Sequence, residues 1–338
     1  MSVPLISICI PTYNRSVHLK NCLASIVEAV KDTKFPYEIC ISNNASEDDT
    51  ANVIDHFREQ LNLVYKENSK NIGVARNILN VVSMAGGEFT WLVGDDDLLL
   101  PDSLQRLGRL IRSNPQVDFI YGNSYQLDSS NLRDRSVDAV IAAIDENTPR
   151  FSSWDQEGPL PFLSLIDPDV SFDYLGGMFL SVFRRENWVE NVSTLDQQVL
   201  EDERLFSHFE NTFPHVAVFA AGFSGSQAYF NATPLNICLS GVREWSVMSP
   251  LINSFRLIEA LGWYSRYGLP RSRYLRYKNY SLRGFLPDLA RMLVSGKRAG
   301  LHYISPKLLL SYLLYPNTYL SIVYYLVEKI RSSLSSNR

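Results

Sequence analysis

Short apolar runs alternate with amphipathic stretches over the first 122 residues of the chain. The apolar runs are rich in β-branched residues, which is typical of buried strands, whereas the stretches between them repeat apolar residues at helical spacing. The predicted strands are residues 5–10, 37–42, 63–65, 89–93 and 117–121. The predicted helices are residues 19–30, 46–61, 74–84 and 103–111. This alternation predicts an α/β fold, with a mostly parallel sheet flanked by helices.

The remainder of the chain changes character twice. Residues 123–175 are irregular and rich in Asp, Ser and Pro, which predicts loops over a site, and residues 176–184 have the pattern of a further strand. From Pro250 onward the pattern is helical, with many Tyr and Arg residues. We therefore expect one α/β domain over residues 1–249 and a helical extension over residues 250–338.

Polar residues gather where three of the predicted strands end. The segment 12–15 follows the first strand, the segment 43–44 follows the second, and the segment 95–97 follows the fourth. Ligands of parallel α/β sheets bind at the carboxyl ends of the strands. We therefore expect these three segments to form one site.

Three consecutive carboxylates, those of Asp95, Asp96 and Asp97, are the sharpest chemical signal. An apolar strand delivers them to one point, where their mutual repulsion favours a bound cation. Hard oxygen ligands suit Mg²⁺ or Mn²⁺, and such an ion would also neutralise a diphosphate. The alternative is a solvated acidic turn before the helix that begins near Asp102 and Ser103.

Charge is distributed unevenly along the chain. Residues 1–255 carry 18 Lys and Arg against 33 Asp and Glu, whereas residues 256–338 carry 14 against 3, within a net charge of −4. A basic segment attached to an acidic body is expected to bind an anionic surface, either a membrane or a nucleic acid. Because the chain shows no RNA-binding motif, we expect no nucleic-acid partner.

A run of twenty uncharged residues, 308–327, lies near the end of the chain. Its length would permit one membrane span, but Pro316 and Asn317 near its centre and five Tyr residues predict two short helices instead. Tyr and Arg are favoured in the lipid headgroup layer, so we expect these helices to lie on an anionic membrane surface. The alternative is a helical subdomain that packs its apolar face internally.

The four cysteines, Cys9, Cys22, Cys40 and Cys238, are scattered without a C-x-x-C pair. Three of them lie inside apolar runs, so we expect reduced thiols in the core. The N-terminal residues lack the basic start and long apolar stretch of a signal peptide. These features predict a cytoplasmic protein.

Four motifs, in this order and at this spacing, resemble glycosyltransferase family 2. They are ICIPTYNR at residues 8–15, ISNNASED at 41–48, NIGVARN at 71–77 and GEFTWLVGDDD at 87–97. The resemblance implies the GT-A fold, a Rossmann-like sheet that binds a nucleotide diphosphate sugar. Within the family, the chain is most similar to the abequosyltransferase-type enzymes of bacterial O-antigen synthesis.

The resemblance implies a role for each matching residue. The residues implied to bind the nucleotide sugar are Pro11, Thr12, Tyr13, Arg15, Asn43, Asn44, Arg76, Asn77, Asp95 and Asp96, and those implied to hold the metal ion are Asp95 and Asp97. Asn43 stands where the family usually has an Asp, which leaves the choice of nucleotide open, because an amide both donates and accepts hydrogen bonds. For Arg76 and Asn77 the alternative is an ordinary polar helix face.

Two further segments are implied to lie on the acceptor side. Gly176 and Gly177 match the family's acceptor-side strand. Arg243 and Trp245 resemble basic and aromatic elements near acceptor sites in the family, although structural packing would explain Trp245 equally well.

Two candidates compete for the base that takes the proton of the acceptor hydroxyl. Glu201 and Asp202 match the letters of the family's Glu-Asp pair, but Asp202 lies 32 residues before Pro234. His215 lies 19 residues before Pro234, which is the spacing expected of the family's base, and Pro214-His215 resembles a pair in the abequosyltransferase-type branch. We favour His215 by this register and keep Asp202 as the alternative. A histidine at this position could equally bind a metal ion.

The combined expectation is a metal-dependent, inverting glycosyltransferase. It would move a hexosyl or deoxyhexosyl group from a nucleotide diphosphate sugar to a hydroxyl of a polyprenyl-diphosphate-linked oligosaccharide, in O-antigen or surface-polysaccharide synthesis. We expect it to be peripheral on the cytoplasmic face of the inner membrane. Two rivals stay open: a sugar-phosphate nucleotidyltransferase, which normally has a Gly-rich basic loop after its first strand, and a catalytically silent glycan-assembly subunit.

Overall fold

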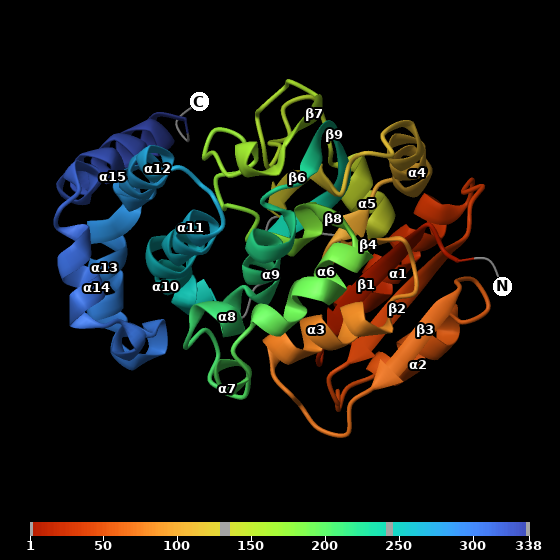
Figure 1. Cartoon of the computed structure of the whole chain (residues 1–338). Helices are drawn as coiled ribbons and strands as arrows, with labels where there is room; N and C mark the ends of the chain where they lie inside the picture. The colour runs from red at the N-terminus through yellow and green to blue at the C-terminus, as the bar shows by residue number, and fades with distance from the viewer. Residues whose placement is uncertain (1–2, 129–135, 241–245, 336–338) are drawn as a thin grey trace.

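A nine-stranded mixed sheet forms the centre of the molecule (Figure 1). The computed structural model describes residues 3–128, 136–240 and 246–335, with side chains described as far as residue 331. The sheet has the order β3-β2-β1-β4-β8-β6-β9-β5, and β7 pairs with β9. The strands are β1 (Ile6–Thr12), β2 (Tyr37–Asn43), β3 (Leu63–Glu67), β4 (Phe89–Leu92), β5 (Leu98–Leu99), β6 (Phe119–Asp128), β7 (Gly158–Pro161), β8 (Ser181–Arg184) and β9 (Gln227–Ser240).

The five strands predicted before residue 122 are all present, as β1, β2, β3, β4 and β6. The first four are joined by parallel pairing. β8 runs antiparallel to both of its neighbours, β4 and β6, and β6 then pairs with β9 in the parallel sense. The predicted α/β fold with a mostly parallel sheet is confirmed, with β5, β7 and β8 as its reversed strands.

Helices cover both faces of the sheet (Figure 1). Those that share a core with Ile6, Ile8 and Ile10 of β1 are α1 (Ser16–Val30), α2 (Thr50–Phe57) and α4 (Ser103–Ser113). Those that share a core with Cys9 are α3 (Val74–Met84), α6 (Arg185–Asn191) and α9 (Pro214–Phe223). Successive residues of β1 therefore enter two different clusters. A strand buried on both faces reads as a continuous apolar run, which is the pattern that predicted it.

The strand predicted over residues 176–184 is shorter in the structure. β8 begins at Ser181, because the preceding chain turns instead of extending. Tyr174 and Leu175 have left-handed backbone conformations, with φ of 53° and 67°. The Asp173 carboxylate accepts hydrogen bonds from the amides of Leu175 and Gly177, at 3.3 and 2.6 Å, and holds this turn.

The segment 123–175 contains more regular structure than predicted. β6 continues to Asp128 after a bulge near Gly122, and α5 (Val137–Ala142) and β7 follow it. Polar side chains in β6 are satisfied inside the fold, since the Asn123 amide donates to the carbonyl oxygens of Ser152 and Ala232. A polar stretch therefore forms a strand here because its buried groups find partners.

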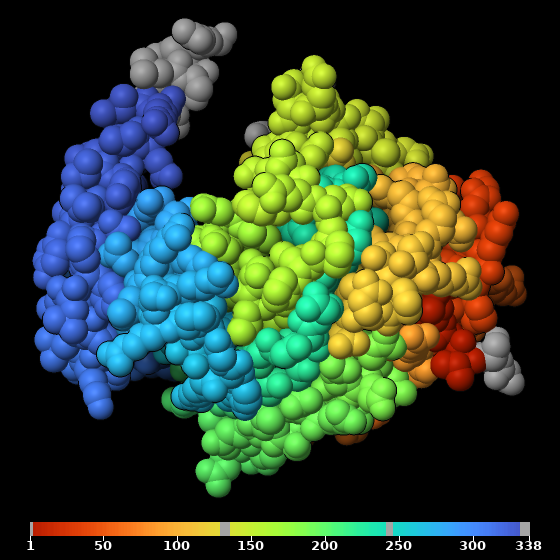
Figure 2. Space-filling view, turned by 45° about the horizontal axis from the view of Figure 1, so that its top comes forward, coloured from red at the N-terminus to blue at the C-terminus, as the bar shows by residue number. Residues whose placement is uncertain are grey.

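The C-terminal region is helical, as predicted. The short helices α7 (Gln197–Leu200) and α8 (Phe209–Thr212) come earlier in the chain, before α9. The helices of the C-terminal region are α10 (Ser249–Leu251), α11 (Leu257–Arg266), α12 (Arg271–Ser281), α13 (Phe285–Ser295), α14 (Pro306–Tyr312) and α15 (Pro316–Ser335). α10, α11, α13 and α14 share an apolar cluster that includes Phe255, Phe285 and Tyr312. Leu261 and Tyr264 of α11 instead enter the core of the α/β part, beside α9. The region forms a lobe on one side of the molecule, blue in Figure 2; the boundary between residues 249 and 250 stays a prediction.

The uncharged run 308–327 is divided between two helices as the sequence predicts, but only the first is short, since α15 has 20 residues. α14 ends at Tyr312 and α15 starts at Pro316. Across the described residues, every helix is too short or too polar to span a bilayer.

Candidate active site

Three strand ends bring the first polar cluster together. Thr12 and Asn43 are register partners at the ends of β1 and β2, and Asp95 follows shortly after β4. The Thr12 hydroxyl donates a hydrogen bond to Asp95 Oδ2 at 2.8 Å. The Arg15 guanidinium donates to Asp95 Oδ1 at 2.8 Å and to Asp96 Oδ2 at 3.1 Å. Arg15 therefore bridges two of the three consecutive carboxylates.

Gly94 allows the acidic turn to fold tightly. A Cβ atom at this position would lie 2.7 Å from Asp97 Oδ2 and 2.9 Å from Asp96 Oδ1, closer than a carbon atom can approach. The Gly94 amide instead donates to Asp97 Oδ2 at 3.0 Å. Asp95 and Asp97 are only 5% and 3% exposed. Burial raises the pKa of Asp95 to about 7, against the opposing effect of Arg15, so the turn favours a positive partner.

The acidic turn offers part of a site for a divalent cation. Asp95 and Asp97, two positions apart at this turn, present two buried carboxylates. Within the described ranges, no cluster of three His, Cys, Asp or Glu side chains is arranged to hold a metal ion. Mg²⁺ is usually bound through one or two carboxylates and completes its coordination with phosphate oxygens and water. Two aspartates therefore fit an ion that is shared with a diphosphate.

The loop after β1 is held against the loop after β2. Pro11 is buried in β1, whereas the Tyr13 side chain is 40% exposed at the surface of the loop. Asn14 has a left-handed backbone conformation, with φ of 52°, and its amide donates to the Ser46 hydroxyl at 2.8 Å. The Ser16 amide donates to the Asp48 carboxylate at 2.8 Å. These contacts fix the position of Arg15 between the two loops.

Asn43 and Asn44 are engaged by groups of the protein. Asn43 accepts from the Ser46 amide at 3.0 Å and donates to the Tyr65 hydroxyl at 3.1 Å. Asn44 accepts from the Ile72 amide at 2.9 Å. Both side chains are almost fully buried. In this structure they connect the strand ends to the segment before α3, and their contact with a nucleotide stays a prediction.

Arg76 and Asn77 differ in their surroundings although both lie in the first turn of α3. Asn77 is 2% exposed and donates to the Ser42 carbonyl oxygen at 3.0 Å. It is therefore not part of a solvated polar helix face, which was the alternative. Arg76 donates to the Ile72 carbonyl oxygen at 2.5 Å, and its guanidinium lies 3.8 Å from the Glu203 carboxylate. Arg76 thus connects α3 with the segment that carries Glu201 and Asp202.

His215 is enclosed at the start of α9. Its ring lies between Phe213 and Phe219, and the residue is 2% exposed. Nε2 lies 3.1 Å from the carbonyl oxygen of Gly176. A carbonyl oxygen only accepts hydrogen bonds, so Nε2 carries the proton and Nδ1 is left as an acceptor. Among the described residues, Nδ1 has no hydrogen-bond partner. Burial lowers the pKa of His215 to about 4, so the ring is neutral at pH 7.

Gly176 contacts the same ring through its carbonyl oxygen. A Cβ at Gly176 would lie 2.7 Å from Leu257 Cδ2, so this position is too tight for a side chain. The structure therefore brings His215 into contact with Gly176, and the acceptor-side role of Gly176 and Gly177 stays a prediction. Arg243 and Trp245, the other residues expected on the acceptor side, lie outside the described residues.

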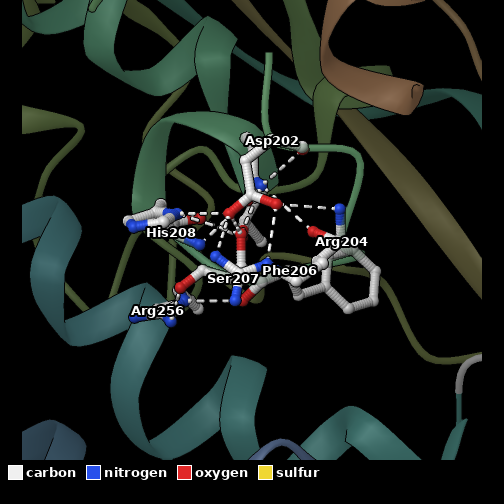
Figure 3. Close-up of polar contacts among 8 residues, drawn as sticks. Asp202, Arg204, Phe206, Ser207, His208 and Arg256 are labelled. Carbon is white, nitrogen blue, oxygen red and sulfur yellow. Dashed lines mark hydrogen bonds and ion pairs between the residues drawn. The ribbon is translucent and has the colours of Figure 1, made fainter. Parts of the chain in front are cut away.

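Asp202 belongs to a polar cluster nearer the surface (Figure 3). Its carboxylate accepts from the Arg204 guanidinium at 2.7 and 2.8 Å and from the Ser207 hydroxyl at 2.7 Å. One of its oxygens also lies 3.2 Å from His208 Nδ1. The paired Arg204 holds the pKa of Asp202 well below its usual range. Asp202 is thus ionised and saturated with protein donors, while Glu201 is exposed.

The comparisons with known proteins decide the family. The family described as "Glycosyl transferase family 2" matches residues 7–180, which is more than half of the chain and contains the β1, β2 and β4 strand ends. The chain belongs to glycosyltransferase family 2.

This family 2 glycosyltransferase has relatives among bacterial sugar transferases. It is 31% identical over 238 residues to an abequosyltransferase of Salmonella typhimurium, an alignment that covers 69% of this chain and 66% of the relative. It is 31% identical to a GalNAc(5)-diNAcBac-PP-undecaprenol beta-1,3-glucosyltransferase of Campylobacter jejuni, over 38% of this chain and 41% of that protein. Both alignments cover less than two thirds of the relatives.

Solved structures share the fold. TarS residues 1–349 of S. aureus, in complex with UDP-GlcNAc, align with a TM-score of 0.54 at 14% identity, over 86% of this chain and 72% of that chain. A mannosyltransferase from Pyrobaculum calidifontis, in complex with GDP-Man and Mn²⁺, aligns with a TM-score of 0.52 at 17% identity, over 100% and 89%. At such identities the likeness concerns the GT-A-like fold.

Sequence reasoning missed two polar residues of the glycosyltransferase. Asp173 is 5% exposed, accepts from the Ser171 hydroxyl at 2.7 Å, and burial raises the pKa of its carboxyl group. An Asp shortly before a Gly-Gly pair in an otherwise apolar stretch is the signal that could have marked it. His208 carries no such signal, since its contact with Asp202 depends on the turn between them.

Proposed function

We propose that this family 2 glycosyltransferase transfers a hexosyl or deoxyhexosyl group from a nucleotide diphosphate sugar to a hydroxyl of a polyprenyl-diphosphate-linked oligosaccharide. The observation that carries the proposal is the convergence of Thr12, Arg15 and Asp95 at the carboxyl ends of β1 and β4. The structural neighbours named with UDP-GlcNAc and GDP-Man support the donor class, and the relative named for a PP-undecaprenol substrate supports the acceptor class. Family membership favours a glycosyltransferase over the nucleotidyltransferase considered from the sequence.

Asp95 and Asp97 are the residues that would hold Mn²⁺ or Mg²⁺. The ion would neutralise charge on the departing nucleoside diphosphate. Arg15 keeps Asp95 and Asp96 together, and Thr12 fixes the second oxygen of Asp95, so the turn is ordered by the protein itself. A preorganised site of this kind costs little reorganisation when charge develops.

The transfer itself exchanges one bond at the anomeric carbon for another. The acceptor oxygen forms a bond to this carbon while the bond to the diphosphate oxygen breaks, so the nucleoside diphosphate leaves and the configuration inverts. The hydroxyl proton passes to a base, for which we favour His215. Its Nδ1 is a buried acceptor without a hydrogen-bond partner among the described residues, whereas the Asp202 carboxylate already accepts several hydrogen bonds.

The C-terminal helices support a location on an anionic membrane surface, at the cytoplasmic face of the inner membrane. α14, α15 and the turn between them expose many large apolar side chains to solvent. These side chains are Leu310, Leu313, Leu314, Tyr319, Leu320, Ile322, Val323, Leu326, Val327 and Ile330. Exposed apolar surface on this scale is typical of an interaction site. The basic character of residues 256–338 favours anionic lipid as the partner.

A screen of nucleotide diphosphate sugars in the presence of Mn²⁺ tests the proposed function. A donor that binds only the folded protein raises its melting temperature. The selected donor is then incubated with the protein, with and without a lipid-linked acceptor, and released nucleoside diphosphate is measured. We expect release that increases with acceptor. Donor binding without any release, under both conditions, would identify the silent assembly subunit instead.

A further inference from the structure

A pocket of about 450 Å³ lies where the C-terminal lobe meets the segment that follows Asp202. Residues of α11 and α12 form two of its walls, and the segment 207–209 forms a third. Tyr303 and Tyr312 close the remaining side. None of the residues predicted to bind donor, acceptor or metal lines this pocket, so it is separate from the strand-end site.

Lys278 places a positive charge on the wall of this pocket. The residue is 8% exposed, and its Nζ lies 5.8, 5.0 and 5.1 Å from the ring centres of Tyr274, Tyr312 and Tyr315. Within the part of the chain that the structure describes, the ammonium group makes no ion pair or hydrogen bond. A buried cation is costly without an anionic partner, and the three rings compensate it only in part.

Two arginines complete the charge of the pocket. Arg266 stands 4.8 Å from the Trp263 ring centre and, in the described ranges, has no carboxylate partner. Arg256 is different, because it pairs with Glu259 at 2.7 Å and donates to the Ser207 carbonyl oxygen at 2.6 Å (Figure 3). Three cationic side chains thus face one carboxylate, and the pocket carries a net positive charge.

Trp263 gives the pocket a flat apolar surface beside these cations. Its ring stacks on Phe209 at 6.0 Å with an angle of 23° between the planes, which fixes its orientation. The part of the Trp263 ring that Phe209 and Arg266 leave uncovered offers apolar surface against which a sugar ring can pack. Glu259 adds a carboxylate that can accept a hydrogen bond from a hydroxyl.

We propose that this pocket binds a sugar that carries a phosphate or diphosphate group, with the anion against Lys278 and Arg266 and the sugar ring against Trp263. This inference rests on the proposed function in one respect, since the diphosphate-linked end of the lipid acceptor has this chemistry. The position of the pocket agrees with an acceptor. The segment 201–208 reaches Arg76 of α3 through Glu203 on one side and Arg256 through Ser207 on the other, so one segment connects α3 with the pocket.

Isothermal titration of the full-length protein tests the pocket with defined probes: N-acetylglucosamine 1-phosphate, inorganic pyrophosphate and free N-acetylglucosamine. We expect saturable binding of the sugar phosphate, and weaker binding of either fragment alone. Lys278→Met should weaken the sugar phosphate at least tenfold. Arg273→Gln removes a charge from an exposed position of the same helix and should change the affinity less than twofold. If Lys278→Met does not fold, Arg266→Gln, at an exposed residue, carries the same test.

Transfer kinetics separate this inference from the proposed function. In Lys278→Met, the KM for the lipid-linked acceptor should rise about tenfold, while kcat and donor affinity stay as in the wild type. Unchanged sugar-phosphate affinity and unchanged acceptor KM in both variants would overturn the pocket assignment and leave the proposed function intact. If the protein transfers no sugar but binds the sugar phosphate in a way that depends on Lys278, the pocket assignment stands and the proposed function is contradicted. If Lys278→Met weakens the affinity for the nucleotide sugar more than the affinity for the sugar phosphate, the pocket belongs to the donor, and this result would also overturn the inference.

Discussion

At the scale of single residues, the protonation state of His215 follows from its place at the start of α9. Burial between aromatic rings disfavours the imidazolium most, and the positive end of the helix dipole acts in the same direction. The bond to the Gly176 carbonyl oxygen fixes the proton on Nε2. The ring therefore presents one unprotonated nitrogen, which is the form that a base requires.

Replacing His215, the proposed base, should slow turnover without weakening the affinity for the donor. A positioned base contributes about 10²–10⁴-fold to the rate, so His215→Ala should lower kcat by roughly this factor at nearly constant donor affinity. Asp202→Asn should cost much less, because Asp202 is engaged with Arg204 and Ser207. Steady-state kinetics and donor titration check both variants. An essential Asp202 beside a dispensable His215 would contradict the assignment, and so would loss of donor binding in His215→Ala.

The same burial makes stability depend on pH. The pKa of His215 is depressed from 6.5 to about 4 in the folded protein, so the unfolded chain takes up a proton first as the pH falls. The contribution of the neutral ring is present above pH 6.5 and is lost towards pH 4, which corresponds to about 3 kcal/mol of unfolding free energy. Urea unfolding at pH 7.5 and 4.5 measures it. His215→Gln should flatten the dependence and the exposed control His56→Gln should keep it; equal slopes in all three proteins would refute the burial argument.

At the scale of elements, most of the exposed large apolar side chains of the C-terminal lobe lie on α14, α15 and the turn between them. Leu314, Ile322 and Leu326 are 83%, 50% and 53% exposed. The internal packing considered from the sequence is thus present, because Tyr312 of α14 enters the apolar cluster of the lobe, and the membrane contact of the exposed face stays a prediction. The basic residues of the lobe would add attraction to anionic lipid that weakens with salt.

Polar substitutions on this face should reduce membrane binding without affecting the fold. In sedimentation with phosphatidylglycerol vesicles, the triple variant Leu314→Asn, Ile322→Asn, Leu326→Asn should lose most of the bound fraction that the wild type shows at low salt. Its melting temperature should stay close to the wild-type value, because the replaced side chains are exposed. Val17→Asn, a 72% exposed site on α1, is the matched control. An unchanged bound fraction in the triple variant would contradict membrane docking by α14 and α15.

The elements that the sequence predicts well are those with local patterns. β1 to β4 and their helices follow from apolar periodicity alone. β8 is shorter than its apolar run, because Asp173 holds a left-handed turn that no propensity shows. The extension of β6 depends on pairing with β9, more than 100 residues later in the chain. The pocket beside Lys278 could not be predicted either, since it requires α12 to meet Tyr312 in space.

The contact between Thr12 and Asp95 could also be predicted from local sequence patterns. Thr12 and Asp95 meet because parallel strands end at one edge, which the alternation of elements implies. The saturation of Asn43, Asn44 and Asp202 by protein groups could not be foreseen, because their partners come from loops whose course is set by tertiary contacts.

At the scale of the whole molecule, one segment links the donor edge to the C-terminal lobe. Residues 201–208 contact α3 through the Arg76–Glu203 pair and the lobe through Arg256. α11 packs on α9, the helix that begins beside His215. The lobe, blue in Figure 2, is therefore attached to the α/β part through α9 and the segment 201–208. A lipid-linked acceptor held by the lobe would reach this site from the membrane side.

Donor binding by Asp97→Ala tests the central claim, a nucleotide diphosphate sugar bound through a metal ion at the acidic turn. The fold should survive, because removing one of three crowded carboxylates relieves repulsion in the metal-free protein. The measurement is the melting temperature of both proteins with the selected donor, with and without Mn²⁺. The account predicts a donor- and Mn²⁺-dependent increase in the wild type and none in Asp97→Ala. Equal stabilisation of the two proteins by donor and Mn²⁺ would contradict it.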